Sequence, residues 1–202
     1  SRLTRKTTSV AALLLALLAS INAAADVVTF PDTRLEAAVR RAISKPTGDI
    51  TNSDLAGLKQ LNTGSLYGAP WNLAGLDHCT DLESLAIRPN VVDLEPLRPL
   101  TKLLSLDLSI SVEKSGLARG NISDISPLAG CTKLAYLSLN CNSISDLSAI
   151  ESMTDLSWLD CSDNLIQDLG PLVRNPGLTG LYDMVFLSHN PLSREALCEP
   201  SP

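Results

Sequence analysis

Aromatic residues are scarce in this chain, which has two Trp, three Tyr and two Phe among its 202 residues. Histidine is equally rare, and His78 and His189 lie far apart in the sequence, so they indicate neither a metal pair nor a catalytic dyad. The G-x-S-x-G elbow, the phosphate loop and the H-E-x-x-H helix are all missing. We therefore expect no enzyme activity, no cofactor and no metal site.

Positive charge is limited as well. Sixteen Lys and Arg are outnumbered by 22 Asp and Glu, which gives a net charge of −6. Nucleic acids and anionic lipid surfaces attract basic proteins rather than acidic ones. The composition therefore argues against nucleic acid or a charged membrane surface as a partner.

No apolar stretch is long enough to cross a membrane. Residues 10–21 form an apolar run of 12, whereas a spanning helix needs about 20. Three basic residues precede this run and three alanines at 23–25 follow it, the pattern of a cleaved secretory signal. We expect removal of residues 1–25, a change in net charge to −9 because three basic residues are lost, and a secreted protein in the periplasm or outside the cell.

What the chain does contain is a repeat of 22 residues. Residues 134–147 (LAYLSLNCNSISDL) are matched by residues 156–169 (LSWLDCSDNLIQDL), and both fit the leucine-rich repeat pattern L-x-x-L-x-[LC]-x-x-N-x-I-x-D-L. One copy cannot bury its apolar face alone, so the copies must stack into a solenoid. The alternation of leucines with polar residues predicts short strands that pair in parallel between copies.

Less regular copies extend this array. They begin at Leu82, Leu103 and Leu178, and a degenerate copy begins at Leu73, which predicts five strands within a repeat domain of residues 65–197. The copy from Leu103 has about nine extra residues around 111–120, and the copy from Leu178 and Leu181 slips by four residues before it resumes at Val185. Residues 198–202 are expected to be a short tail.

Two polar positions of the repeat have predicted structural roles. Asn142 and Asn164 should lie buried at the turn, bonding backbone groups that would otherwise be unpaired. A column of carboxylates resembles a set of calcium ligands, but capping of the turn that follows each of them is the favoured interpretation. The column consists of Asp93, Asp124, Asp146 and Asp168.

Residues 26–64 follow a different pattern, which predicts a helical N-terminal cap. Thr33 and Glu36 are spaced as a capping box for a first helix, which the Lys-Pro-Thr-Gly sequence at 45–48 ends. A second helix is expected to start at residues 51–54 and to carry Leu55, Leu58 and Leu61. Such a cap would cover the leucine core and the free strand edge at the end of the solenoid.

These segments resemble a known family. The stretches FPDTRLEAAVRRAISKPTGDITNSDLAGLKQL, LAGLDHCTDLESL and NISDISPLAGCTKLAYLSL look like the secreted bacterial leucine-rich repeat proteins of the internalin type, over roughly residues 28–197. The resemblance implies an α/β solenoid with parallel strands on the concave face, 3₁₀ turns on the convex face and a helical cap. It also implies a protein-binding module.

The outward strand positions form three predicted rows on the concave face. The first row is Ser84, Ser105, Tyr136, Trp158 and Met184; the second is Ala86, Asp107, Ser138, Asp160 and Phe186; the third is Arg88, Ser109, Asn140, Ser162 and Ser188. Trp and Tyr are enriched where interfaces carry binding energy. We therefore expect a monomer that binds a protein or peptide partner through Arg88, Asp107, Tyr136, Asn140, Trp158, Asp160, Met184 and Phe186. The alternatives are simple cross-strand stacking of the rings and recognition of a carbohydrate by the same strip.

The five cysteines do not define a disulfide framework. Cys79 and Cys131 occupy equivalent positions two coils apart, about 10 Å, which is too far for a bond. Cys161 replaces a core leucine and should behave as a small buried hydrophobe. A bond between Cys141 and Cys161 stays open, and Cys198 lies in the tail.

Overall fold

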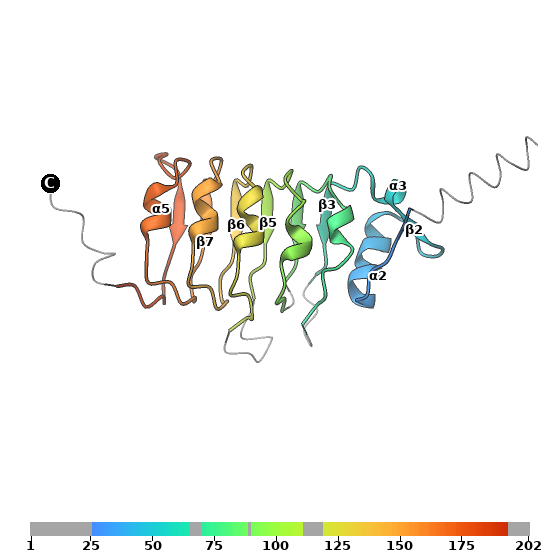
Figure 1. Cartoon of the computed structure of the whole chain (residues 1–202), viewed down its shortest axis with the longest axis horizontal. Coiled ribbons are helices and arrows are strands. Elements are labelled where there is room, and N and C mark those ends of the chain that lie inside the picture. Colours follow the sequence, from blue (N-terminus) through green and yellow to red (C-terminus); the bar gives the residue numbers. More distant parts are fainter. Residues whose placement is uncertain (1–25, 65–69, 89, 111–118, 194–202) are drawn as a thin grey trace, which may run out of the picture.

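The computed structural model describes residues 26–64, 70–88, 90–110 and 119–193, and these form one row of stacked coils (Figure 1). The predicted signal at 1–25, the tail at 198–202 and residues 111–118 lie outside the described residues. Within the described ranges, no helix has the length and apolarity needed to cross a membrane. The structure therefore tests the repeat domain and its cap.

One parallel sheet runs the length of the array. Its strands follow the order of the sequence, so each pairs with the strand of the next coil. The strands are β3 (Gln60–Asn62), β4 (Ser84–Ala86), β5 (Ser105–Asp107), β6 (Tyr136–Ser138), β7 (Trp158–Asp160) and β8 (Met184–Phe186). The sheet has six strands where the sequence predicted five, because Leu61 begins the array from within the predicted cap.

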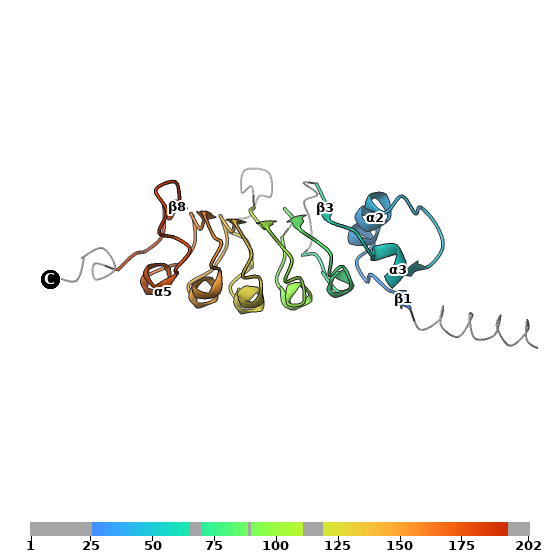
Figure 2. The ribbon, with the colours of Figure 1, turned by 90° about the horizontal axis from the view of Figure 1, so that it is seen from above.

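Short helical turns form the opposite side of each coil (Figure 2). They are η1 (Leu76–His78), η2 (Glu95–Leu97), η3 (Ser126–Gly130), η4 (Ser148–Ser152) and α5 (Gly170–Arg174). Strands on one side and turns on the other enclose a single core of leucine, isoleucine and valine. This arrangement confirms the predicted α/β leucine-rich repeat solenoid.

The central residue of each strand points into this core. Leu61, Leu85, Leu106, Leu137 and Leu159 are at most 3 % exposed, whereas Val185 in the final described strand is 38 % exposed. Each inner strand has a coil on both sides, but within the described residues β8 has a neighbouring strand on one side only. Leu181, predicted as part of the last copy, is 97 % exposed. That assignment was wrong, because the four-residue slip places Leu181 in the loop before β8.

The asparagine of the repeat ties adjacent coils together. The Nδ2 of Asn164 donates to the carbonyls of Leu139 and Cys161, at 3.0 and 3.1 Å. Asn142 donates in the same way to the carbonyls of Leu108 and Leu139, at 3.1 and 3.0 Å. Both asparagines are fully buried, which confirms the prediction.

The aspartate column caps the turns, as the favoured interpretation held. Oδ1 of each carboxylate accepts from the backbone N–H two residues further on, at 2.8 Å for Asp124, Asp146 and Asp168 and 2.9 Å for Asp93. This bond satisfies a donor at the start of each helical turn, where no carbonyl is available to it. The described residues contain no group of three His, Cys, Asp or Glu side chains that could hold a metal ion.

The first helix of the cap, α2 (Thr33–Ala42), is capped by a different residue from the one predicted. Asp32 is the N-cap, and its side chain accepts from the N–H of Arg34. Glu36 pairs with Arg40 instead of closing a capping box with Thr33. Asp32 also binds the Arg34 guanidinium at 2.6 Å and the N–H of Asn72 at 3.3 Å, so it attaches the helix to the chain that leads into the repeats.

The second helix is shorter than predicted. α3 (Asn52–Leu55) starts where it was expected, with a capping box between Thr51 and Asp54, but it ends after four residues. Gly57 follows with φ +80°, a conformation that favours glycine and stops the helix. The chain then enters β3, so Leu61 lies in a strand and not in the helix. A small antiparallel pair, β1 (Val27–Val28) with β2 (Ile50–Thr51), completes the cap.

The extra residues of the long copy rejoin the array at a tightly packed glycine. The N–H of Gly120 donates to the carbonyl of Cys141 at 2.7 Å. A Cβ atom at this position would collide with the side chains of Ile110 and Asn142. Glycine is therefore required where the chain returns to the core.

The cysteines at 79, 131, 141 and 161 are free thiols. The pairing of Cys141 with Cys161 that the sequence left open is therefore wrong. Cys79, Cys131 and Cys161 are fully buried, which for Cys161 confirms the prediction of a small buried hydrophobe. Burial raises the pKa of Cys79 to about 12 and that of Cys131 to about 11.

Candidate functional site

The structure aligns the rows of the concave face in the predicted register. Ser105 is opposite Tyr136, Tyr136 opposite Trp158, and Trp158 opposite Met184. In the second row, Asp107, Ser138, Asp160 and Phe186 follow one another on the same four strands. The strand residues predicted for binding therefore lie on one continuous surface of β5 to β8.

Three aromatic rings on this surface contact one another. The rings of Tyr136 and Trp158 stack with centroids 4.2 Å apart and planes 8° from parallel. Phe186 meets Trp158 from the other side, at 5.5 Å and 51°. We call these three residues the aromatic ladder. Ring contact fixes the side chains in place, so a partner that binds here does not have to order them.

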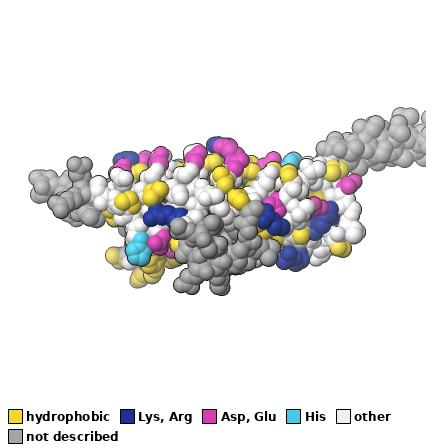
Figure 3. Space-filling model, turned by 90° about the horizontal axis from the view of Figure 1, so that it is seen from below, with side chains coloured by type: hydrophobic (Ala, Val, Ile, Leu, Met, Phe, Trp, Pro, Cys, Tyr) yellow, Lys and Arg dark blue, Asp and Glu magenta, His cyan; other side chains and the backbone are white. Residues whose placement is uncertain are grey.

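An exposed apolar surface continues from the ladder toward the C-terminal end. Met184 is 53 % exposed and Phe186 44 %, and Leu181 and Tyr182 in the preceding loop are 97 % and 90 % exposed. The chain around β8 reaches further out on the strand side than the other coils do (Figure 2). Seen from the lower edge of the solenoid, hydrophobic side chains project at this end (Figure 3).

Leu181 and Tyr182 were missed by the sequence analysis. The feature of the sequence that could have indicated them is the spacing of 26 residues between Trp158 and Met184, four more than the 22 residues of the repeat. Asp183 holds the extra residues as a loop, because its side chain accepts from the N–H of Gly180 at 2.5 Å. A strict 22-residue template assigns Leu181 to the core, but the pairing of β7 with β8 leaves it outside.

Two carboxylates flank the hydroxyl end of Tyr136. Oδ1 of Asp107 accepts from the N–H and hydroxyl of Ser109, and Oδ2 accepts from Nε of Arg88 at 3.0 Å. Burial raises the pKa of the Tyr136 hydroxyl, and the charges of Asp107 and Asp160 raise it further. A hydrogen bond with Ser138 lowers the pKa only in part, so Tyr136 stays neutral at physiological pH.

Asp160 is held in the same way one coil beyond Tyr136. Its Oδ1 accepts from the N–H of Ser162 and its Oδ2 from Nδ2 of Asn140, both at 2.9 Å. Asn140 thus orients Asp160 as Arg88 orients Asp107. The structure brings all four polar residues predicted for binding into two bonded pairs beside the aromatic ladder.

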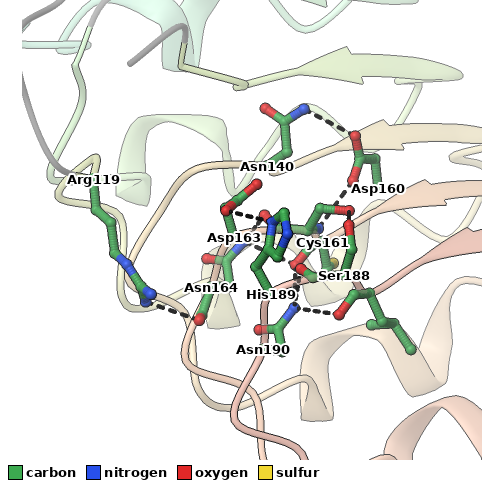
Figure 4. A network of polar contacts seen from close by, with 11 residues as sticks. Arg119, Asn140, Asp160, Cys161, Asp163, Asn164, Ser188, His189 and Asn190 are labelled. Carbon is green, nitrogen blue, oxygen red and sulfur yellow. Dashed lines mark hydrogen bonds and ion pairs between the residues drawn. The ribbon is translucent and has the colours of Figure 1, made fainter. Parts of the chain in front are cut away.

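A further row of polar residues follows the strands at the turn (Figure 4). Cys141, Asp163 and His189 occupy equivalent positions with φ of 58°, 56° and 59°. Nδ1 of His189 lies 3.0 Å from Oδ1 of Asp163, and Arg119 donates to the carbonyl of Asn164 at 2.8 Å. Burial and the charge of Asp163 raise the pKa of the Cys141 thiol. A raised pKa disfavours the thiolate form of Cys141.

The stacked coils, the parallel strands on one face and the helical cap define a leucine-rich repeat protein. Among solved structures, the chain is similar to internalin C2 of Listeria monocytogenes, at 27 % identity over 85 % of this chain and 91 % of that one, with a TM-score of 0.40. It is also similar to internalin F of Listeria monocytogenes, at 22 % identity, 81 % of this chain and TM-score 0.38.

A third similar structure is the functional domain of InlJ from Listeria monocytogenes, at 21 % identity, 82 % of this chain and TM-score 0.44. This chain spans 58 % of the internalin F structure and 42 % of the InlJ structure. No protein-family model and no curated protein matches the chain. All three TM-scores lie below 0.5, so the proposed function rests on the surface of this chain alone.

Proposed function

We propose that this protein is an exported binding module that recognises a protein or peptide partner on the concave face of its repeats. The contact residues are Arg88, Asp107, Tyr136, Asn140, Trp158, Asp160, Met184 and Phe186. We add Leu181 and Tyr182 at the C-terminal margin. No catalytic step is part of this proposal.

The aromatic ladder, half-buried at Tyr136 and Trp158 and exposed at Phe186, is the observation that carries the proposal. Three of the seven aromatic residues of the chain are joined by ring contacts, Tyr136 to Trp158 and Trp158 to Phe186, on the outer surface of the sheet. Stacking alone would explain a stable pair, but it does not explain why Met184, Leu181 and Tyr182 extend the same apolar surface into solvent. A contiguous exposed apolar surface rimmed by polar groups is typical of a protein interaction site.

A carbohydrate partner is less well supported. Sugars stack on free aromatic faces, but Tyr136 and Trp158 cover one face of each other. The surface is also open along β5 to β8, which suits an extended or bulky partner better than a small one. A glycan array tests this alternative directly, since specific binding of a sugar that requires Trp158 would favour it.

The test of the proposal is selection of short random peptides displayed on phage against the purified chain, followed by affinity measurement on variants. We expect the selected peptides to bind Trp158→Ala at least tenfold more weakly than the wild type, because Trp158 is the centre of the aromatic ladder. Val173→Ala is the matched control, since Val173 is 84 % exposed on the opposite side of the coil. Val173→Ala should bind the selected peptides with the affinity of the wild type.

Thermal melts should show that both variants remain folded. Peptides that bind Trp158→Ala as tightly as the wild type, or a selection that yields no specific peptide, would contradict the proposed site. Export is tested separately by intact mass. Loss of residues 1–25 from the protein recovered outside the cytoplasm supports export, and an uncleaved chain retained inside argues against it.

A further inference from the structure

The aromatic ladder stops abruptly at Tyr136. Trp158 covers one face of the Tyr136 ring, and the parallel stack turns the other face toward β5. The residue in register there is Ser105, and the next one on β4 is Ser84. Serine is too short to cover a ring that stands on the neighbouring strand. Among the described residues in register with Tyr136, none therefore covers this face of the ring, and a position about 4.8 Å wide, one strand spacing, is left beside it above Ser105.

A carboxylate borders this position. Asp107 lies two residues after Ser105, on the same strand and the same face of the sheet. It is in register with Ser138 on the next strand, two residues along from Tyr136. A carboxylate has about four acceptor sites, and Asp107 uses three of them, for the N–H and hydroxyl of Ser109 and for Arg88.

Arg88 binds Asp107 from the third row. It lies two residues after Ala86, which is in register with Asp107, whereas Ser105 belongs to the first row. Its side chain is 52 % exposed, whereas that of Asp107 is 13 % exposed. The carboxylate is thus held in a fixed orientation, with one of its about four acceptor sites not used by these bonds.

We propose that the protein partner places an arginine side chain above Ser105, where its guanidinium stacks on the open face of Tyr136 and donates to Asp107. This inference rests on the proposed function and specifies the chemistry of the partner. A guanidinium is planar, so it continues a stack of parallel rings, which a lysine ammonium cannot do. Its fork of N–H groups also matches a carboxylate.

The charge of the whole chain agrees with a basic partner. The net charge of −6 attracts a positively charged segment and speeds its encounter with the concave face. Stacking and a charge-assisted hydrogen bond then select arginine at one position of that segment.

Asp160 offers a matched comparison within the same surface. It has the same place in its coil as Asp107 and the same backbone bond two residues on. The aromatic residue two positions before it is Trp158, whose ring contacts Tyr136 on one side and Phe186 on the other. No ring face stands open beside Asp160, so this carboxylate should not select arginine.

The experiment uses the peptides selected on the wild-type chain, synthesised once with arginine and once with citrulline, its neutral and nearly isosteric analogue. At the peptide position that binds above Ser105, replacing arginine by citrulline should weaken binding by about tenfold. This dependence should disappear in Asp107→Asn and in Ser105→Trp, which fills the vacant position. It should persist in Asp160→Asn and in Ser84→Trp, which alter the equivalent carboxylate and the next strand.

Failure of this inference can be told apart from failure of the proposed function. Peptides that need Trp158 but bind equally well with citrulline would overturn the arginine position and leave the proposed function intact. Arginine dependence that survives Asp107→Asn and Ser105→Trp would also overturn it, because the arginine would then bind elsewhere. Peptides that need neither Trp158 nor arginine would remove both proposals.

Discussion

Asn164 accepts a hydrogen bond from the backbone N–H of Ile144, in the preceding coil, at 3.0 Å. The same carboxamide donates to Leu139 of that coil and to Cys161 of its own, so one buried side chain bridges two repeats. Oδ1 of Asn142, one repeat earlier, has no hydrogen-bond partner among the described residues. Gly120 is packed against that oxygen, at the point where the long copy rejoins the array.

Replacing Asn164 should therefore destabilise the fold strongly. We expect Asn164→Ala to lower the free energy of unfolding by about 1–3 kcal/mol, because it leaves the buried Ile144 N–H without a partner and removes one of the two side-chain hydrogen bonds to each of the Leu139 and Cys161 carbonyls. Urea denaturation measures the loss. Asn190→Ala is the control, since Asn190 makes the same bonds at a more exposed place. Equal losses in the two variants would contradict the role of burial.

The attachment of the cap should depend on pH. Hydrogen bonds from Arg34 lower the pKa of Asp32 to about 2, below the value near 3.9 of an unfolded chain. The ionised form therefore stabilises the fold above about pH 4, and this contribution, about 2 kcal/mol, is lost as the pH falls toward 2. Asp32→Asn should be less stable than the wild type at pH 7.

The difference between these two proteins should shrink between pH 4 and pH 2. Urea titrations at several pH values in this range measure it. Asn is also a good N-cap, so the substitution removes the charge and keeps the cap. A difference that stays constant down to pH 2 would show that the Asp32 charge does not hold the cap.

The four described thiols should react at different rates. Cys141 is half-buried, whereas Cys79, Cys131 and Cys161 are fully buried. Burial raises the pKa of all four thiols, so access to the sulfur distinguishes them. Alkylation with iodoacetamide at pH 8 should therefore modify Cys141 first and the other three only after unfolding in urea. Peptide mass spectrometry assigns each site. Rapid labelling of Cys161 in the native protein would show that its coil opens.

Calcium should not stabilise the repeats. Oδ1 of Asp146 is engaged by the N–H of Ser148, and its role is to cap the turn. We expect Asp146→Ala to cost about 1 kcal/mol and Asp146→Asn only a few tenths, because asparagine caps equally well. Melting temperatures of the wild type should be the same in calcium and in chelator. A clear rise with calcium would favour the ligand hypothesis.

The repeat allowed much of the fold to be predicted. Its period placed β4 to β7 and aligned Tyr136 with Trp158, and both structural asparagines were assigned correctly. The wrong predictions lie where the sequence departs from the 22-residue period. Leu61 appeared to continue a helix because its spacing from Leu55 and Leu58 fits a helical face, but Gly57 ends that helix. Leu181 fitted the leucine template, yet it lies in a loop.

The sequence by itself determined the solenoid, because a leucine face that one coil cannot bury forces identical coils to stack and brings equivalent positions into rows. Only the tertiary structure decided which contacts the side chains of those rows make. It stacked Tyr136 on Trp158, bonded Arg88 to Asp107 and placed Ser105 in register with Tyr136. Ring orientation and exposure depend on the neighbouring strands in space, and a linear pattern does not contain that information.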